Sequence, residues 1–287
     1  MRPHYIIKTH SIFLWLSFFA LLTGCSENEY DTVNAFCKSN PELCQEFEKD
    51  SWCDIEHLAL LKGKLAYRED PEGPGMAQQL KGYKDYAECE LLYAGSMQVK
   101  VAAKSNLRTK NAMIALQRHE EIMEDVVSSN QPDLLYYLWS ESGDKKYMER
   151  LLLLEDDPVM QTPERKLLLI SHYVKRDQKK ARKLLISALL LSDPEKGVNA
   201  DIFRGLSTLS TQAKKPDKAY LWLKVSLALS PIEQGNTQQS LDLYAARHTL
   251  DQAALDPLAE RRVEAIRDGR YLRKAKVEEA PRRMNLR

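Results

Sequence analysis

The sequence predicts an all-α fold in which helical hairpins stack on one another, either as a solenoid or as an irregular bundle. Composition is the first indication, because glycine is scarce, at 11 of 287 residues, while Leu, Ala, Lys and Glu dominate. The second is that apolar residues recur at helical spacing from Cys37 onward, between short breaks and with almost no strand-like alternation.

The chain begins with the pattern of an export signal. Arg2 and Lys8 give a positive start, and an uninterrupted apolar run extends from Ile12 to Leu22. As a helix this run spans about 16 Å, roughly half the hydrocarbon core of a bilayer, so we do not expect a permanent membrane span. Residues 1–24 are therefore predicted to be a cleaved signal peptide.

Residues 22–25 (Leu-Thr-Gly-Cys) end this run and resemble the lipobox of bacterial lipoproteins. The resemblance implies cleavage before Cys25, with lipid on its thiol and on the freed amine, and two or more acyl chains hold a protein firmly on a membrane. By the same resemblance, Ser26 implies the periplasmic face of the outer membrane in a Gram-negative host. Residues 25–33 would be the lipidated tether. The alternative is an ordinary signal peptide with a chance cysteine.

Four further cysteines, Cys37, Cys44, Cys53 and Cys89, are an even number in what should be an oxidising compartment, so we expect two disulfides. Four cysteines allow three pairings, and the sequence does not choose among them. We prefer Cys37 with Cys44, which closes a tight turn, and Cys53 with Cys89, which closes a long loop. No pair has C-x-x-C spacing, so these cysteines are predicted to be structural staples and not a metal or redox site.

The stapled region, residues 34–131, is divided into helices by cap and turn residues. Asn40 is predicted to be the N-cap of a short helix that begins at Pro41, and Asp54 to cap the next helix. A loop rich in proline and glycine and two longer helices follow, at residues 70–75, about 76–97 and about 107–127.

The spacing becomes repetitive over residues 132–231, where each unit is a helix, a turn that contains Asp, a second helix and a proline. The terminal prolines, Pro158, Pro194 and Pro231, are 36 and 37 residues apart, close to the tetratricopeptide period of about 34. Each hairpin has one apolar side that it cannot bury alone, which is why such units stack.

The third unit resembles a tetratricopeptide repeat best, because Phe203 and Leu206 stand at the packing positions of its first helix. The packing positions of its second helix hold Ala219, Leu223 and Ser226. The second unit has Ala181, Leu185 and Ala188 at the same spacing, whereas the first unit lacks the small residues. The region resembles degenerate tetratricopeptide or Sel1-like repeats, and a plain irregular bundle is the alternative.

The C-terminal part, residues 232–271, is predicted to hold capping helices near 238–249 and from Pro257 onward. Residues 272–287 are predicted to be a basic, solvated and disordered tail. The mature chain has little net charge, since 40 of the 42 Lys and Arg remain after the signal peptide is removed, against 41 Asp and Glu. A nucleic-acid partner is therefore not expected.

The chain as a whole also resembles an uncharacterised family of Gram-negative lipoproteins that is defined only as a domain of unknown function. The resemblance rests on the lipobox, on residues 36–38 and 41–44, on Trp52 with Cys53, and on the later hairpins. It covers roughly residues 25–260 and implies a lipoprotein without implying an activity.

Motifs that carry chemistry are missing. His119 and Glu120 suggest the start of H-E-x-x-H, but position 123 is Met, and no G-x-S-x-G elbow, P-loop or dinucleotide fingerprint occurs. We therefore predict no catalytic residue, no metal and no cofactor. Tyr137 and Trp139 are the first candidates for a partner-binding surface, because adjacent aromatic positions on a helix point in different directions.

The sequence thus favours a non-enzymatic scaffold in the cell envelope, attached to the membrane by lipid on Cys25 and bound to an unidentified protein partner. The alternative is an enzyme or small-ligand binder that acts on cell-wall or lipid components, with a site assembled from several helices.

Overall fold

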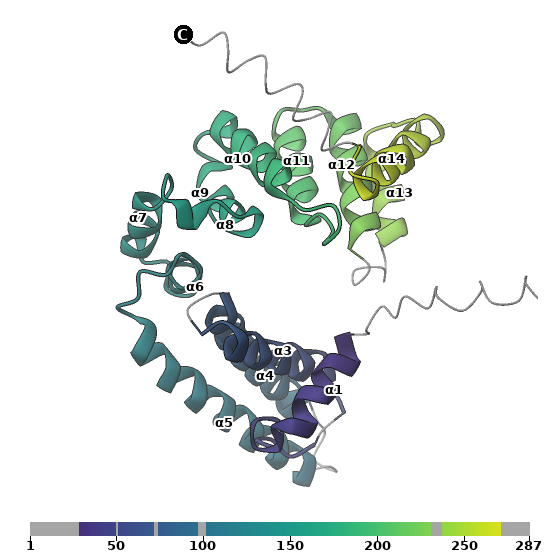
Figure 1. The fold of residues 1–287 in the computed structure, drawn as a ribbon. Coiled ribbons are helices and arrows are strands. Elements are labelled where there is room, and N and C mark those ends of the chain that lie inside the picture. The colour runs from purple at the N-terminus through teal and green to yellow at the C-terminus, as the bar shows by residue number, and fades with distance from the viewer. Residues whose placement is uncertain (1–28, 50, 72–73, 97–101, 231–236, 271–287) are drawn as a thin grey trace, which may run out of the picture.

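The computed structural model describes residues 29–49, 51–71, 74–96, 102–230 and 237–270, and it is all-helical (Figure 1). No strand occurs in these ranges, which confirms the predicted fold class. The apolar run from Ile12 to Leu22, Cys25 and the basic tail lie outside the described residues.

The N-terminal half is a helical hairpin with a helix packed on either side of it. α3 (Asp54–Glu69) and α4 (Pro74–Ser96) form the hairpin, and α5 (Ala102–Val126) packs along α4. α1 (Glu29–Ser39) lies against α3 and leads into the single turn α2 (Pro41–Cys44). The side chains at the centre of this half are Cys53, Leu60, Tyr83, Tyr86, Ala87, Ala112 and Ala115.

Glycine lets the two helices of this hairpin approach closely. A Cβ atom placed on Gly82 would lie 2.6 Å from the Cα of Leu60, and one on Gly63 would lie 2.7 Å from the backbone nitrogen of Gln79. Since no real Cβ contact is that short, only glycine fits between α3 and α4 at this separation.

The C-terminal half continues as short helices joined by capped turns. Gly143 ends α6 in the left-handed region at φ 67°. Asp144 and Asp177 each accept a backbone hydrogen bond at the start of the next helix. The predicted breaks at these residues are confirmed. The helices are α6 (Pro132–Ser142), α7 (Lys145–Leu153), the 3₁₀ turn η2 (Pro158–Met160), α8 (Pro163–Leu168), α9 (Ile170–Tyr173), α10 (Gln178–Leu191), α11 (Asp201–Gln212), α12 (Pro216–Leu229), α13 (Thr237–Arg247) and α14 (Gln252–Arg267).

Successive hairpins share cores, so packing passes from one to the next along the chain. On α10, Leu184 is buried with the core of α6 and α7, whereas Leu185 and Ala188 are buried with α11. The helices accordingly follow a curved path from α5 through α6 and α9 to α14 (Figure 1).

The hairpin of α11 and α12 confirms that the predicted small residues lie where the helices approach each other. Ser207 Oγ donates to the carbonyl oxygen of Ala219 at 2.8 Å, and Ser226 Oγ donates to that of Ala200 at 2.9 Å. Phe203 is fully buried beside them. Bulkier side chains at Ala219 and Ser226 would separate the two helices.

Three predicted boundaries are corrected. α1 begins at Glu29, so the second half of the segment 25–33 expected as a tether is helical. The side chain of Asn40 does not cap α2; its amide donates to the carbonyl oxygen of Phe36 at 2.9 Å and so closes α1. α14 starts before Pro257, because Asp251 caps it and the proline removes only one early hydrogen bond of the helix.

The glycine contact predicts a difference between two alanine variants of the same helix. Gly82→Ala should lower the free energy of unfolding by about 1–3 kcal/mol, since α3 must shift to admit the methyl group. Gly95, also on α4, has open space around its Cβ position, so Gly95→Ala should be neutral or stabilising by up to about 1 kcal/mol. Urea unfolding followed by circular dichroism, without reductant, measures both. Equal stability of the two variants would contradict the close approach.

Candidate functional site

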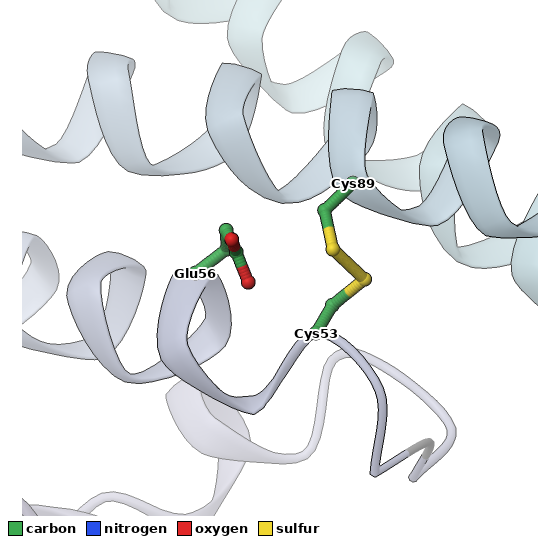
Figure 2. A group of neighbouring side chains, drawn as sticks. All are labelled: Cys53, Glu56 and Cys89. Carbon is green, nitrogen blue, oxygen red and sulfur yellow. A yellow bond between two sulfur atoms is a disulfide. The ribbon is translucent and has the colours of Figure 1, made fainter. Parts of the chain in front are cut away.

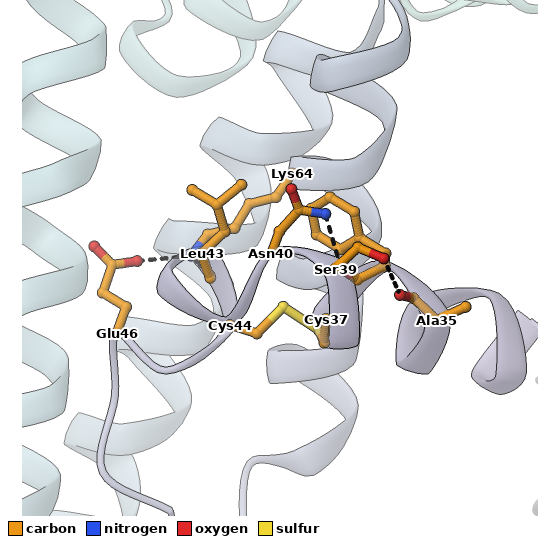
Figure 3. The surroundings of a disulfide bond; sticks show 9 residues. Ala35, Cys37, Ser39, Asn40, Leu43, Cys44, Glu46 and Lys64 are labelled. Atoms are coloured by element: carbon orange, nitrogen blue, oxygen red, sulfur yellow. Dashed lines mark hydrogen bonds and ion pairs between the residues drawn. A yellow bond between two sulfur atoms is a disulfide. The ribbon is translucent and has the colours of Figure 1, made fainter.

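The four predicted staples form two disulfides, in the pairing that the sequence analysis preferred. Cys37 and Cys44 close the turn between α1 and α2 (Figure 3). Cys53 and Cys89 join the start of α3 to α4 (Figure 2). The second bridge closes a loop of 36 residues and fixes the chain that leads into α3.

A buried ion pair lies beside the first disulfide, where Lys64 reaches from α3 toward Glu46 (Figure 3). Lys64 is only 4% exposed, and its Nζ donates to Glu46 Oε2 and to the carbonyl oxygen of Leu43, both at 2.7 Å. The same carboxylate accepts from the Tyr83 hydroxyl at 3.0 Å and from Arg118 Nε at 2.8 Å. We call Glu46, Lys64, Tyr83 and Arg118 the Glu46 cluster.

Burial and charge act in opposite directions on the pKa values of Glu46 and Lys64 in the Glu46 cluster. Burial alone would raise the pKa of Glu46, but the hydrogen bond and charge of Lys64, with Arg118 and Tyr83, lower it overall. Burial lowers the pKa of Lys64, and the bond to Glu46 opposes this. Burial also raises the pKa of Tyr83. The hydrogen bonds of the cluster join α3, α4 and α5 to the chain segment that carries Glu46.

One group of side chains has the proximity of a metal site but not its chemistry. Cys53, Glu56 and Cys89 place donor atoms within 4.8 Å of one another (Figure 2). The two sulfurs are bonded to each other, so neither offers the thiolate that a metal such as zinc requires. Elsewhere in the described ranges no three His, Cys, Asp or Glu side chains come this close.

The structure moves one of the two predicted contact residues into the core. Tyr137 is 6% exposed, and its hydroxyl lies 2.7 Å from His119 Nε2, between α6 and α5. The expectation that Tyr137 contacts a partner is corrected, because α6 turns this ring toward its neighbours. Trp139 is half-buried, with its ring 5.6 Å from that of Tyr136.

An exposed tryptophan that the sequence analysis did not propose lies beside the second disulfide. Trp52 is 55% exposed. Its ring lies 5.0 Å from that of Tyr93 and 5.4 Å from the guanidinium carbon of the fully buried Arg108. Stacking and cation–π attraction thus fix one side of the indole while much of the ring remains exposed.

Further apolar side chains lie next to Trp52 in the chain or along α4. Ile55, in the first turn of α3, is 79% exposed, and Leu91 and Leu92 are exposed on α4, just past Cys89. We call Trp52, together with Ile55 nearby in the chain, the Trp52 surface; Leu91 stands about 160° around α4 from Tyr93, the ring that contacts Trp52, and so belongs to another face. The exposure of Trp52 could have been expected from the sequence. The residue follows a polar stretch without helical periodicity, and such a stretch does not predict burial.

A hollow lies in the other half of the chain. It has a volume of about 560 Å³ and is lined by residues 194–198, Ala228, Leu229, Ile266 and Arg267. Arg267 donates to the carbonyl oxygen of Ala228 at 3.0 Å, so this cation closes the end of α12. The hollow contains no buried pair of acidic and basic side chains.

None of the described helices combines the length and the apolar character that crossing a bilayer requires.

The Glu46 cluster predicts a large loss of stability when its buried cation is removed. Lys64→Met leaves Glu46 buried with one charge partner fewer, and the free energy of unfolding should fall by about 3 kcal/mol. Lys81→Met on α4 is the control, since Lys81 pairs with Asp85 at the surface, where such a pair contributes less than about 1 kcal/mol. Urea unfolding of both variants, without reductant, measures this. Equal losses would show that the pair is not buried.

His119 predicts a loss of stability in mild acid. Burial lowers the pKa of His119 from its ordinary 6.5. The folded state therefore binds fewer protons, and this contribution is complete above about pH 6.5 and decreases as the pH falls below it. His119→Gln can still hydrogen-bond Tyr137 but does not titrate, so it should lose less stability than the parent between pH 7.5 and 5. An unchanged slope of unfolding free energy against pH would contradict the assignment.

Comparison with known proteins gives a family without an activity. Neither the curated proteins nor the solved structures that were searched include a match. Residues 22–224 match the family described as "Protein of unknown function (DUF2989)". This match begins before Cys25, includes both disulfides, the Glu46 cluster and the Trp52 surface, and continues into α12. The chain belongs to the DUF2989 family.

Proposed function

We propose that this protein is a lipid-anchored, non-enzymatic scaffold on the periplasmic face of the outer membrane, which binds a protein partner through the Trp52 surface. The observation that carries the proposal is the exposed, fixed indole of Trp52. The anchor part is supported by the lipobox-like residues 22–25, which lie inside the family match.

The start of α1 limits the distance between the proposed lipid anchor and the folded domain. Since α1 starts at Glu29, only residues 26–28 separate Cys25 from the first described helix. An extended link of that length spans roughly 10–14 Å between Cys25 and Glu29. Acylation of Cys25 would hold α1, and with it the N-terminal half, close to the membrane surface.

Binding of a protein is supported by the chemistry of the Trp52 surface. Tryptophan is enriched where interfaces gain most of their binding energy, and Trp52 presents an exposed ring held from beneath by Tyr93 and the buried Arg108. The second disulfide and the buried arginine order this surface before any partner arrives, which lowers the entropic cost of binding. A partner with apolar side chains would cover Trp52 and Ile55.

We further infer that helices α6 to α12 are degenerate tetratricopeptide-like repeats that display the partner surface at one end of a stack. Capped hairpins, shared cores and the small residues Ala219 and Ser226 support this. The helix between Pro163 and Tyr173 is interrupted at Leu169, which accounts for the weak repeat pattern.

A second candidate function is binding of a small ligand from the cell wall or the lipids, with or without catalysis. The hollow supports it, because the charged residues Glu195, Lys196 and Arg267 line it together with apolar residues, a mixture that suits a small polar ligand. The two functions can be distinguished at Trp52, because only protein binding requires this residue.

The test places a photoreactive amino acid at position 52 of the full chain in living cells and at position 153 as the control. Leu153 is also exposed but lies on α7, away from the Trp52 surface. Illumination should give one protein adduct from position 52 and none from position 153, and Trp52→Ala should remove co-purification of that protein. Adducts at both positions, or at neither, would contradict the partner surface.

The anchor is tested separately. Cys25→Ala should move the protein from the membrane fraction to the aqueous one, because no acyl chain can then be attached at position 25. An unchanged membrane fraction would refute lipidation at Cys25 and would leave the Trp52 experiment interpretable on its own.

A further inference from the structure

The outer face of α5 carries exposed apolar side chains that the Trp52 surface does not include. Met113 is 58% exposed, and Leu116 and Val127 are also exposed. A shallow groove of about 320 Å³ is lined by this helix alone, through Lys110, Met113, Ile114, Leu116, Gln117 and Glu120. α5 runs along the outer edge of the N-terminal half (Figure 1).

The exposed residues form a regular stripe along the helix. Their spacing alternates between four and three residues, which is the pattern with which two helices pack side by side. The stripe consists of Asn106, Lys110, Met113, Gln117, Glu120, Glu124 and Val127, and each of these residues is exposed.

The order of charged residues along the stripe is unfavourable for an isolated helix. Lys110 stands in its first half, whereas Glu120 and Glu124 stand in its second half. The first turn of α5 has no acidic residue and the last turn no basic residue. A helix dipole favours the opposite order, with acids near the start and bases near the end. The order does suit a second helix that lies antiparallel to the first.

We propose that α5 is a self-association surface, on which two copies of this chain pair their α5 helices antiparallel about position 115. A residue n then faces residue 230 − n of the second copy. Lys110 faces Glu120, Met113 faces Gln117, and Asn106 faces Glu124. The two-fold axis repeats each contact, so two ion pairs flank a centre in which each Met113 packs against a Gln117.

Charge selects this register over its neighbour. One other long register also brings the two stripes into contact. It is centred between residues 118 and 119, half a heptad further along the helix. It would bring Met113 against Glu124 and leave Lys110 opposite Val127, so that it would form no ion pair. Within one chain Lys110 pairs with Glu48 at the surface. Such an exposed pair is weak, so the lysine can exchange it for Glu120 of the second copy.

The size of the contact fixes the strength of the dimer. The stripe from Asn106 to Val127 is roughly 32 Å long, and one helix face of this length buries on the order of 500 Å² per copy. The total of about 1,000 Å² is at the low end of specific interfaces, so the dimer should be weak and reversible. It involves neither the lipid nor the Trp52 surface.

A charge swap on the full chain tests the pairing. In sedimentation equilibrium at low salt, the parent mass should rise with concentration toward twice that of one chain. Lys110→Glu and Glu120→Lys should each weaken the dimer at least tenfold, because each sets like charges together across the two-fold axis. The double variant restores opposite charges and should return to within about threefold of the parent. Lys183→Glu, an exposed change on α10, is the matched control and should have no effect.

A second measurement tests the direction and the register. Spin labels on single cysteines at Met113→Cys and at Glu124→Cys should give inter-copy distances of roughly 12 Å and 29 Å, since the axial offset grows by about 3 Å per residue from position 115. All substituted positions are exposed, and circular dichroism confirms that each variant is folded. A monomeric parent, a double variant that stays dissociated, or equal distances at both positions would each overturn the proposal.

Discussion

The carboxylate of Glu46 is the point at which four parts of the N-terminal half meet. It lies in the chain between the two disulfides and accepts from α3 through Lys64, from α4 through Tyr83 and from α5 through Arg118. A carboxylate that stayed buried after losing one of these partners would cost several kcal/mol, so the folded state keeps α3, α4 and α5 in contact with it. The positions of the Trp52 surface and of α5 both depend on this constraint.

Close backbone contact and buried charge therefore act together. Gly63 and Gly82 bring α3 against α4, and this approach places Lys64 within reach of Glu46 and of the ring of Tyr83, 5.2 Å away. The short first disulfide then needs only to hold a turn that the ion pair already positions. In the C-terminal half the hairpins depend on small residues and on shared leucines of α10, with separate ion pairs such as that of Arg165 with Asp133 at 2.9 Å.

The sequence predicted features that are local and missed those that depend on distant neighbours. Gly143, Asp144 and Asp177 act within one turn of themselves, so the helix boundaries they set were predictable. The disulfide pairing was preferred among three that the sequence left open, and the structure decides it. The Glu46 cluster was not predictable, because its partners are 18 to 72 residues away. Tyr137 was misplaced because the facing of a ring on α6 is decided by where α5 lies.

The Trp52 surface and the α5 contact, each weak alone, could reinforce each other in a chain that is both lipid-anchored and dimeric. In a two-fold dimer each copy contributes its own Trp52 surface and its own Cys25, so one assembly would carry two partner sites and two anchors. A partner that meets both sites would bind with an effective concentration set by the dimer and not by the solution. The same reasoning explains why the α5 contact need not be strong. Acylation at Cys25, as proposed above, would confine the chains to a membrane and raise their local concentration, so that even a small, charge-paired stripe could select the second copy.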